Sequence, residues 1–230
     1  MIEGLRHILF PDVCVACGRL LEPGEQYVCA GCFAEFSPYP GPAAGGDALK
    51  RIVREHFGEG TAPSDAWCLY PYRSVGRLHE AIHALKYEGI FPLGHLFGRR
   101  LGELVASGCG QAAFDGIVPV PLHALKRIER SYNQAGKIAE GLAGLLGVPL
   151  MDEVIVRQRY TGSQTGLTSA ARKRNVNRAF RPGRAACPSR VLLVDDVVTT
   201  GATMTAAASV LLDSGASSVA FAAVALTEKA

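Results

Sequence analysis

The chain has 230 residues, of which 48% are hydrophobic and 20% charged, and its formal net charge is +3. These values are typical of a globular protein with one large or two small domains, and the charge is too small to indicate polyanion binding by itself. Residues 1–10 lack the long apolar core of a secretory signal, and the apolar tail 205–226 is interrupted by Asp213, Ser214 and Gly215. We therefore expect a cytoplasmic protein with no membrane span.

Two matched pairs of cysteines lie near the N-terminus: Cys14 with Cys17, then Cys29 with Cys32. In a chain without a secretion signal, such pairs favour a tetrahedral zinc site over disulfides. Four thiolates leave no open coordination position, so we expect the Zn²⁺ to be structural. A redox-active pair is the alternative, although two matched pairs fit one redox centre poorly. We assign residues 1–36 to a zinc-ribbon-like module.

The rest of the chain divides into a linker and a larger domain. Residues 37–64 are rich in proline and glycine and predict a linker, with a helical stretch over 47–56. Residues 65–230 alternate between strand and helix patterns, which predicts an α/β domain with a parallel sheet. The expected strands are 67–72, 115–121, 153–157, 191–195 and 218–226, and the expected helices are 75–87, 93–105, 133–146 and 203–214.

One motif in the first of these helices belongs to a different class of protein. His79, Glu80 and His83 form the H-E-x-x-H pattern of zinc peptidases, in which Glu80 would be the general base and Glu103 a possible third ligand. The simpler interpretation of the two histidines is a polar helix face, and we favour it.

A basic segment precedes the last two strands. Between residues 157 and 190 there are eight arginines and one lysine, and no aspartate or glutamate. Such a block is a candidate for contact with phosphate, pyrophosphate or nucleic acid, and the alternative is a solvated basic loop.

The segment 191–203 is the most informative. Its branched apolar residues predict a strand buried on both faces, and Asp195 and Asp196 follow at the carboxyl end, where parallel sheets bind ligands. The following turn offers backbone N–H groups, hydroxyls and a glycine at a helix start, which suits a phosphate. Because carboxylates beside a phosphate suit sugar hydroxyls or a divalent cation, the segment predicts a site for a phosphorylated sugar with Mg²⁺.

This segment resembles the phosphoribosyl pyrophosphate (PRPP) signature of type I phosphoribosyltransferases, with no gap or missing position. The resemblance implies the parallel-sheet fold of those enzymes for residues 65–230, and Mg²⁺ bound with PRPP. It also implies that Asp195 and Asp196 hold the ribose 2′- and 3′-hydroxyls. The residues that would wrap the 5′-phosphate are Thr199, Thr200, Gly201, Ala202 and Thr203.

The four-cysteine front and the segments 84–89 and 117–134 resemble the competence protein F family of phosphoribosyltransferase-like proteins. The segment 84–89 implies an anion-binding role for Lys86. The segment 117–134 implies a loop that faces pyrophosphate, and Ser131 stands where the family usually has glycine. The candidate counter-charges in that loop are Lys126, Arg127 and Arg130.

The segment 159–180 also resembles that family, and in type I enzymes a flexible loop in this place closes over PRPP. A closed loop excludes water and protects the cationic sugar intermediate from hydrolysis. The candidate closing residues are Thr161, Gln164, Arg172 and Lys173.

The family resemblance implies a PRPP-binding phosphoribosyltransferase linked to DNA uptake, with an acceptor and a general base that the residues do not identify. The alternative is a non-catalytic accessory factor that binds single-stranded DNA, works with DNA-uptake proteins and uses PRPP as a regulator. Its aromatic residues for base stacking within the basic segment are few, only Tyr160 and Phe180.

Overall fold

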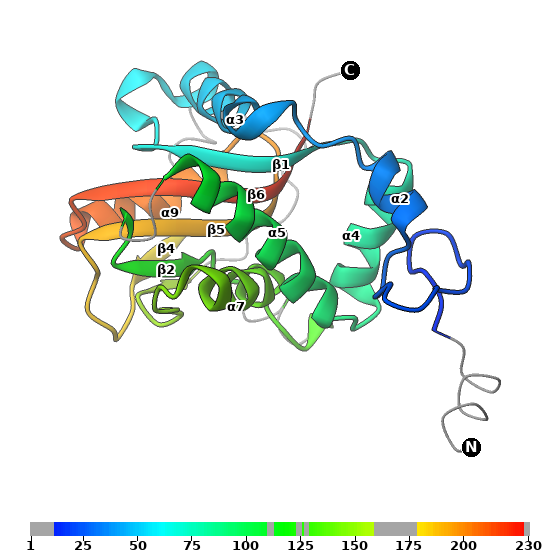
Figure 1. Ribbon diagram of the computed structural model, residues 1–230. Helices are drawn as coiled ribbons and strands as arrows, with labels where there is room; N and C mark the ends of the chain where they lie inside the picture. The colour runs from blue at the N-terminus through cyan, green and yellow to red at the C-terminus, as the bar shows by residue number, and fades with distance from the viewer. Residues whose placement is uncertain (1–11, 110–112, 123–125, 127–128, 159–178, 228–230) are drawn as a thin grey trace, which may run out of the picture.

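The computed structural model describes residues 12–109, 113–122, 126, 129–158 and 179–227. Its centre is a four-stranded parallel sheet in the order β1-β6-β5-β2 (Figure 1). The strands are β1 (Ala66–Tyr72), β2 (Gly116–Pro119), β5 (Arg190–Val198) and β6 (Ser218–Thr227). The α/β class expected from the alternating pattern is confirmed.

Strand β5 consists largely of branched apolar residues because both of its faces are covered. Leu192 and Val194 belong to a core cluster with α5 (Pro92–Gly108) and α7 (Gln134–Leu146). Leu193 belongs to the opposite cluster, with α3 (Gly41–Phe57) and α9 (Ala202–Asp213). In Figure 1, α5 and α7 lie in front of the sheet and α9 lies behind it.

The cysteine segment packs against one end of this domain. It contains α2 (Ala30–Glu35), and Phe36 directly after it lies edge-on to Tyr70 of β1, with ring centroids 5.5 Å apart. Arg77, the first residue of α4 (Arg77–Tyr87), donates from Nη1 to the carbonyl of Ala16 at 3.0 Å. Helix α4 therefore lies between the cysteine segment and the sheet (Figure 1).

The helix in the Pro/Gly-rich stretch is longer than the sequence indicates. Instead of 47–56 it spans Gly41–Phe57, and a 3₁₀ turn, η1 (Glu59–Thr61), follows it. Its Leu49 and Val53 are fully buried in the core. A Cβ on Gly45 or Gly46 would overlap the carbonyl oxygens of β1. The glycines that suggested a linker are thus the residues that let α3 lie directly on the sheet edge.

The expected strand at 153–157 forms, but outside the parallel sheet. It is β3 (Ile155–Arg157), which pairs antiparallel with β4 (Phe180–Pro182) in a separate two-stranded sheet. Sequence reasoning missed β4 because three residues ending in proline carry no periodicity.

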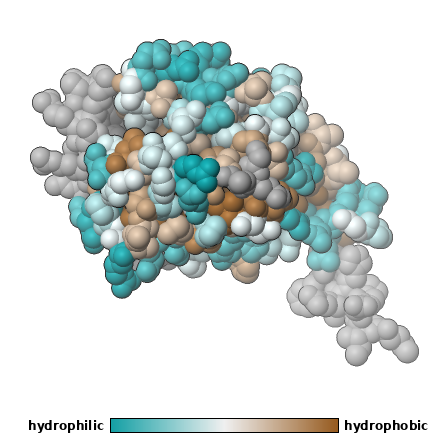
Figure 2. All heavy atoms as spheres, turned by 60° about the vertical axis from the view of Figure 1, so that its left-hand side comes forward, coloured by the Kyte–Doolittle hydropathy of each residue, from teal (hydrophilic) through white to brown (hydrophobic). Residues whose placement is uncertain are grey.

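The described helices and the surface also bear on membrane association. No helix among the described residues combines the length and the apolarity that a bilayer crossing demands. The face shown in Figure 2 mixes hydrophilic and hydrophobic residues.

The close approach of α3 to β1 predicts a strong effect of Gly46→Ala. Because the new methyl group would meet the backbone carbonyl of Ala66, α3 must move away, and we expect a loss of about 1–3 kcal/mol in the free energy of unfolding. Gly144→Ala is the matched control: Gly144 lies in α7 with open space at its Cβ position. It should gain about 0.5–1 kcal/mol from helix propensity. Urea unfolding measures both, and equal effects of the two variants would contradict this packing.

Candidate functional site

The candidate site is a cavity of about 300 Å³ at the carboxyl ends of β2 and β5. The carboxylates of Asp195 and Asp196 form the acidic part of its wall. Cations and amide groups come from α4, from the segment around the start of α7, and from β3. Its charged and polar lining residues are Lys86, Lys126, Arg130, Asn133, Gln134, Arg157, Asp195, Asp196 and Thr203. Parallel sheets bring ligands to this edge, as the sequence predicts.

The two carboxylates end the buried part of β5. Asp195 Oδ1 accepts from the backbone N–H of Asp196 at 2.9 Å, and Asp196 Oδ1 accepts from the N–H of Val197 at 2.6 Å. Burial, and next the charge of Asp196, raise the pKa of Asp195 from its ordinary 3.8 to about 7. A carboxylate with so high a pKa is short of partners that stabilise its charge, and a ligand with hydroxyl donors or a cation would supply them.

Lys86 from α4 gives Asp196 such a partner. Lys86 Nζ lies 3.1 Å from Asp196 Oδ2, and the two side chains are only 20% and 14% exposed. Burial lowers the pKa of the Lys86 ammonium, but the charge and hydrogen bond of Asp196 and the charge of Asp195 together outweigh burial, so the net shift of this pKa is upward. Lys86 therefore remains charged at the cavity and fixes the position of α4 relative to β5.

Arg130 and Gln134 form the opposite wall. Arg130 Nη1 donates to Gln134 Oε1 at 3.2 Å, and its Nη2 donates to the hydroxyl of Tyr87 at 3.0 Å. Gln134 is only 2% exposed. Within the described part of the chain, Arg130 Nε and Gln134 Nε2 are buried without a hydrogen-bond partner. Spare N–H donors beside a cation make this wall suitable for an anion.

A left-handed residue shapes the segment before α7. Ser131 has a φ of 64°, a conformation that glycine adopts without steric cost. The replacement of the family's glycine by Ser131 therefore leaves the turn intact. The next residue, Tyr132, donates its hydroxyl to the carbonyl of Leu85 in α4. The turn is thereby attached to the helix that carries Lys86.

The phosphate-binding turn of the sequence interpretation lies where β5 passes into α9. Gly201 is the N-cap of α9 with a φ of 79°, and Thr200 Oγ1 accepts from the N–H of Ala202 at 3.4 Å. The first N–H groups of a helix lack intrahelical partners and suit an anion. Of the five residues of this turn, Thr203 lines the cavity and the others lie directly before it in the chain.

The structure thus brings together, around one cavity, six of the ten residues predicted to bind PRPP or pyrophosphate that it describes, whereas Thr199, Thr200, Gly201 and Ala202 do not line this cavity. The six are Lys86, Lys126, Arg130, Asp195, Asp196 and Thr203. Sequence reasoning did not single out Asn133, Gln134 and Arg157 as lining residues, although Asn133 and Gln134 end the segment 117–134 of the family resemblance and Arg157 begins the basic segment. Five further predicted residues lie outside the described residues: Arg127, Thr161, Gln164, Arg172 and Lys173.

The four cysteines form a separate cluster whose Sγ atoms all lie within 4.8 Å of one another. Cys14 and Cys32 Sγ are 3.7 Å apart, and Cys17 and Cys29 Sγ are 3.8 Å apart. Sulfur atoms bound tetrahedrally to one Zn²⁺ at about 2.3 Å are separated by about 3.8 Å, so the donor set and its spacing fit this ion. The backbone N–H of Cys32 is the main cause that lowers the pKa of Cys29. The cluster can therefore hold a metal ion.

The histidines of the peptidase-like motif have other partners. Tyr72 Oη lies 2.8 Å from His79 Nδ1, and Glu88 Oε1 lies 3.4 Å from His83 Nδ1. In the part of the chain that the structure describes, the four cysteines are the only group of potential ligands close enough to share a metal ion. The peptidase interpretation therefore has no support in the described geometry.

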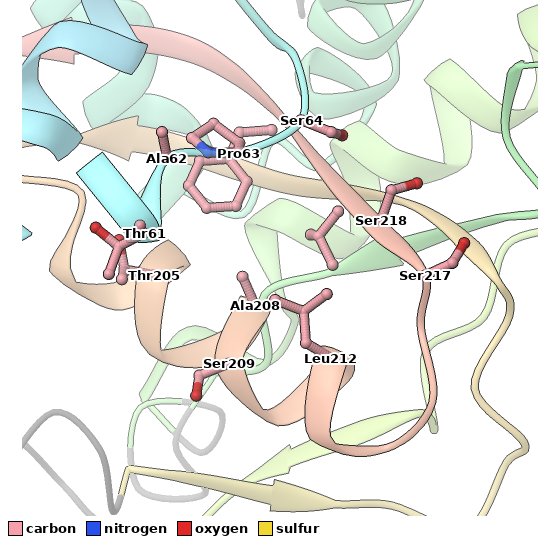
Figure 3. A pocket seen from close by; sticks show the side chains of 13 residues that line it. Thr61, Ala62, Pro63, Ser64, Thr205, Ala208, Ser209, Leu212, Ser217 and Ser218 are labelled. Carbon is pink, nitrogen blue, oxygen red and sulfur yellow. The ribbon is translucent and has the colours of Figure 1, made fainter. Parts of the chain in front are cut away.

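A second cavity, of about 340 Å³, lies away from the carboxylates, between the η1 segment and α9 (Figure 3). No charged side chain lines it. Thr61, Ser209 and Ser217 line it together with apolar residues that include Pro63 and Leu212. Its uncharged walls make it unsuitable for a phosphorylated ligand.

Comparison with known proteins agrees with this geometry. Residues 130–230 match the family model described as "Phosphoribosyl transferase domain". Competence protein F of Haemophilus influenzae is 28% identical over 199 residues, which cover 83% of this chain and 86% of that protein. The DNA utilization protein YhgH is 39% identical in Salmonella typhi and 37% in Escherichia coli, each over 105 residues. The matched region spans about half (46%) of these YhgH proteins.

Solved structures give weaker matches. A glutamine phosphoribosylpyrophosphate amidotransferase of B. subtilis has a TM-score of 0.39 and 23% identity, over 56% of this chain and 26% of that one. A purine phosphoribosyltransferase of Pyrococcus horikoshii has a TM-score of 0.35 and 21% identity, over 59% and 78%. At these scores the structural likeness adds no argument to the sequence matches.

The similarity to competence protein F runs along most of both chains and includes more than the phosphoribosyltransferase domain. Together with the cysteine cluster that precedes this domain, it fits the resemblance to the competence protein F family.

Proposed function

We propose that this chain binds PRPP with Mg²⁺ and transfers the phosphoribosyl group to an acceptor, in the handling of DNA that enters the cell. The observation that carries this proposal is the meeting of Asp195 and Asp196 with Lys86 and Arg130 around one cavity at the start of α9. Sugar hydroxyls need acceptors and phosphates need donors and cations, and this cavity offers both. The names of the relatives, competence protein and DNA utilization protein, support the link to DNA.

In this proposal each part of PRPP has its own partners. Asp195 and Asp196 accept hydrogen bonds from the ribose 2′- and 3′-hydroxyls, and residues 199–203 bind the 5′-phosphate. The cations at the cavity, Lys86, Lys126 and Arg130, bind the pyrophosphate, and Arg127, which lies outside the described residues, is a further candidate. The candidates for a covering loop are Thr161, Gln164, Arg172 and Lys173.

Phosphoribosyl transfer develops charges of opposite sign in its transition state, and the site must stabilise both together. As the bond between C1 and pyrophosphate breaks, positive charge develops on the ribose ring and negative charge on the departing oxygens. Asp195 and Asp196 stabilise the ring, and the cations stabilise the pyrophosphate. When bound, Mg²⁺ would neutralise pyrophosphate charge, and the hard oxygen donors of the two aspartates suit this ion. Binding the acceptor beside C1 further accelerates the reaction, because the two reacting groups are then held in proximity.

The proposal extends to the organisation of the chain. Residues 1–36 are a structural zinc module, residues 37–64 connect it, and residues 65–230 are the phosphoribosyltransferase-like domain. We place the protein in the cytoplasm, because a reducing compartment keeps four metal-binding cysteines as thiols.

A second candidate function is a non-catalytic factor that binds single-stranded DNA beside DNA-uptake proteins, with PRPP as a regulator. It is favoured by a hollow of about 540 Å³ between the cysteine segment and α5, lined by Phe33, Arg99 and Arg100. Arg100 Cζ lies 3.9 Å from the centroid of the Phe33 ring. Cations beside an aromatic ring are the elements of sequence-independent single-strand binding.

Conservative changes of the carboxylates test the first proposal. Asp195→Asn and Asp196→Asn preserve shape but weaken the acceptance of hydroxyl hydrogen bonds, so each should reduce the affinity for PRPP–Mg²⁺ roughly 10- to 100-fold. Isothermal titration calorimetry measures this affinity, and pyrophosphate release with a set of nucleobases measures turnover. Asp213→Asn, at the exposed end of α9, is the matched control and should bind as the wild type does.

The same titrations separate the two candidate functions. PRPP binding without turnover, together with salt-sensitive binding of single-stranded DNA, would favour the accessory factor. If calorimetry of the wild type shows no heat with PRPP–Mg²⁺, PRPP binding is rejected for both candidate functions.

The raised pKa of Asp195 predicts a pH dependence of stability. Between about pH 4 and pH 7 the folded protein holds the Asp195 proton and the unfolded chain has released it, so this group's contribution to the free energy of unfolding falls as the pH rises. Asp195→Asn removes this loss and should therefore gain stability relative to the wild type over this interval. Urea unfolding at a series of pH values measures the difference, and a constant difference from pH 4 to pH 7.5 would count against it.

Loss of one metal ligand should empty the cysteine cluster. Purified wild-type protein should contain one Zn²⁺ per chain, whereas Cys32→Ser should contain almost none and should melt at a lower temperature. Elemental analysis and thermal melting provide the two measurements. Cys187→Ser, a partly buried cysteine outside the cluster, is the control. Full zinc content in Cys32→Ser would show that the cluster is not the site.

A further inference from the structure

The second cavity, of about 340 Å³, lies at the end of the sheet opposite the first cavity, which contains Asp195 and Asp196. Ser64 lies just before β1 and Ser217 directly before β6, so the second cavity is at the amino ends of these strands. Ligand sites in parallel sheets lie at the carboxyl ends, so the second cavity is not a part of the PRPP site. Its volume is within the range of small-molecule pockets.

The walls of the second cavity combine hydroxyl groups with apolar surface, and none of the described residues that line it is charged. Leu212 is 48% exposed, and Figure 3 shows it with Ala208 on the side of α9 that faces β6. A ligand bound here would cover this leucine, whereas a phosphate would meet no cation. The residues that bring hydroxyl groups are Thr61, Ser64, Thr205, Ser209, Ser217 and Ser218.

Two of these hydroxyl groups already donate their hydrogen to the protein. Thr61 Oγ1 donates to the carbonyl of Gly58 at 2.8 Å, and Ser217 Oγ donates to the carbonyl of Ser189 at 3.0 Å. Because a hydroxyl oxygen has two lone pairs, both can still accept hydrogen bonds. The second cavity therefore offers acceptors around an apolar surface, which suits an uncharged ligand with O–H or N–H donors.

Thr205 provides independent evidence that this wall lacks a partner. Its side chain lines the second cavity, and its Oγ1 is buried without a hydrogen-bond partner in the part of the chain that the structure describes. A buried hydroxyl without a partner destabilises the fold. A polar ligand that reaches this side chain from the cavity would remove that cost.

Helix α9 separates the two cavities. Thr203 lines the first cavity and Thr205 lines the second. Each helical residue turns the chain by about 100°, so residues two positions apart lie on opposite sides of the helix. The two cavities therefore share the first turn of α9, which directly follows the phosphate-binding residues of the proposed function.

The other wall of the second cavity is also connected to that turn. Thr61 belongs to η1, which follows α3 in the chain. A Cβ on Gly201 would lie only 2.7 Å from Cγ2 of Val53 in α3, so α3 packs directly on the phosphate-binding turn. A ligand between η1 and α9 thus restrains two elements that meet at Gly201. This restraint lowers the cost of ordering the turn when a second ligand binds.

We propose that the second cavity binds an uncharged nucleoside and that its occupation tightens the binding of PRPP at the first cavity. A nucleoside combines a flat, partly apolar ring with O–H and N–H donors, and it has no charged group. The effect on the first cavity rests on the proposed function, whereas nucleoside binding at the second cavity does not. Coupling between two sites is reciprocal, so PRPP must tighten nucleoside binding by the same factor.

Thymidine and adenosine are the probes for this site. Isothermal titration calorimetry with the full-length, zinc-loaded protein should give a dissociation constant of roughly 1 mM or lower for at least one of them. Saturation with PRPP–Mg²⁺ should lower this constant about 5-fold or more. The 5′-monophosphate of the same nucleoside should not displace it, because the second cavity offers no cation.

Substitutions in the two cavities locate the bound nucleoside. Ser209 is exposed on α9 and lines the second cavity, so changes there leave the core intact. Ser209→Phe fills the cavity and should weaken nucleoside binding roughly 10-fold or more, whereas Ser209→Ala leaves the space open and should retain most of the binding. Asp195→Asn, in the first cavity, should bind the nucleoside as the wild type does. Circular dichroism melting establishes that each variant is folded.

The remaining outcomes overturn distinct parts of the inference. If neither nucleoside binds while PRPP does, the second site is rejected and the proposed function stands. Binding that Asp195→Asn weakens and Ser209→Phe does not places the nucleoside in the first cavity. A nucleoside affinity that PRPP leaves unchanged, although PRPP itself binds, rejects the coupling. Nucleoside binding in a protein that does not bind PRPP rejects the proposed function and the coupling but not the second site.

Discussion

The organisation of the site depends on two carboxylates that a buried strand holds beside each other. Apolar residues anchor β5 on both faces, so Asp195 and Asp196 cannot move away from one another or into bulk water. The resulting repulsion and burial raise the pKa of Asp195. The ion pair between Asp196 and Lys86 partly relieves this cost and draws α4 to the end of the sheet. A ligand that supplies hydroxyl donors or a cation would relieve the rest.

Small residues determine how close the remaining elements come to this strand. Gly45 and Gly46 let α3 rest on the backbone of β1, and Gly98 lets α5 meet the backbone of α7 around Ile138. Close helix packing positions α7, whose first residue Gln134 lines the same cavity as Arg130 and the carboxylates. Uncharged contacts between helices therefore help to position the cavity wall, in addition to the ion pair between Lys86 and Asp196.

Helix α4 connects three features that lie far apart in the sequence. Its first residue, Arg77, donates a hydrogen bond to the cysteine segment, its last turn carries Lys86, and one side carries the neighbouring rings of His79, His83 and Tyr87. A metal ion in the cysteine cluster would fix the first of these contacts. The module at the N-terminus can thus influence the position of Lys86 through α4, although it does not contact the cavity.

The sequence by itself determined the local features of this protein, because each arises within a few neighbouring residues. The apolar run before Asp195, the Thr/Gly turn after it and the paired cysteines are read directly from order and spacing. The tertiary structure decided what no local pattern records: that Gly45 and Gly46 belong to a packed helix, that β3 pairs with β4, and that Gln134 and Arg157 line the cavity. It also decided that the histidines of α4 continue a row of rings toward Arg130. These features depend on contacts between residues distant in the chain, which form only when the sheet and its helices assemble.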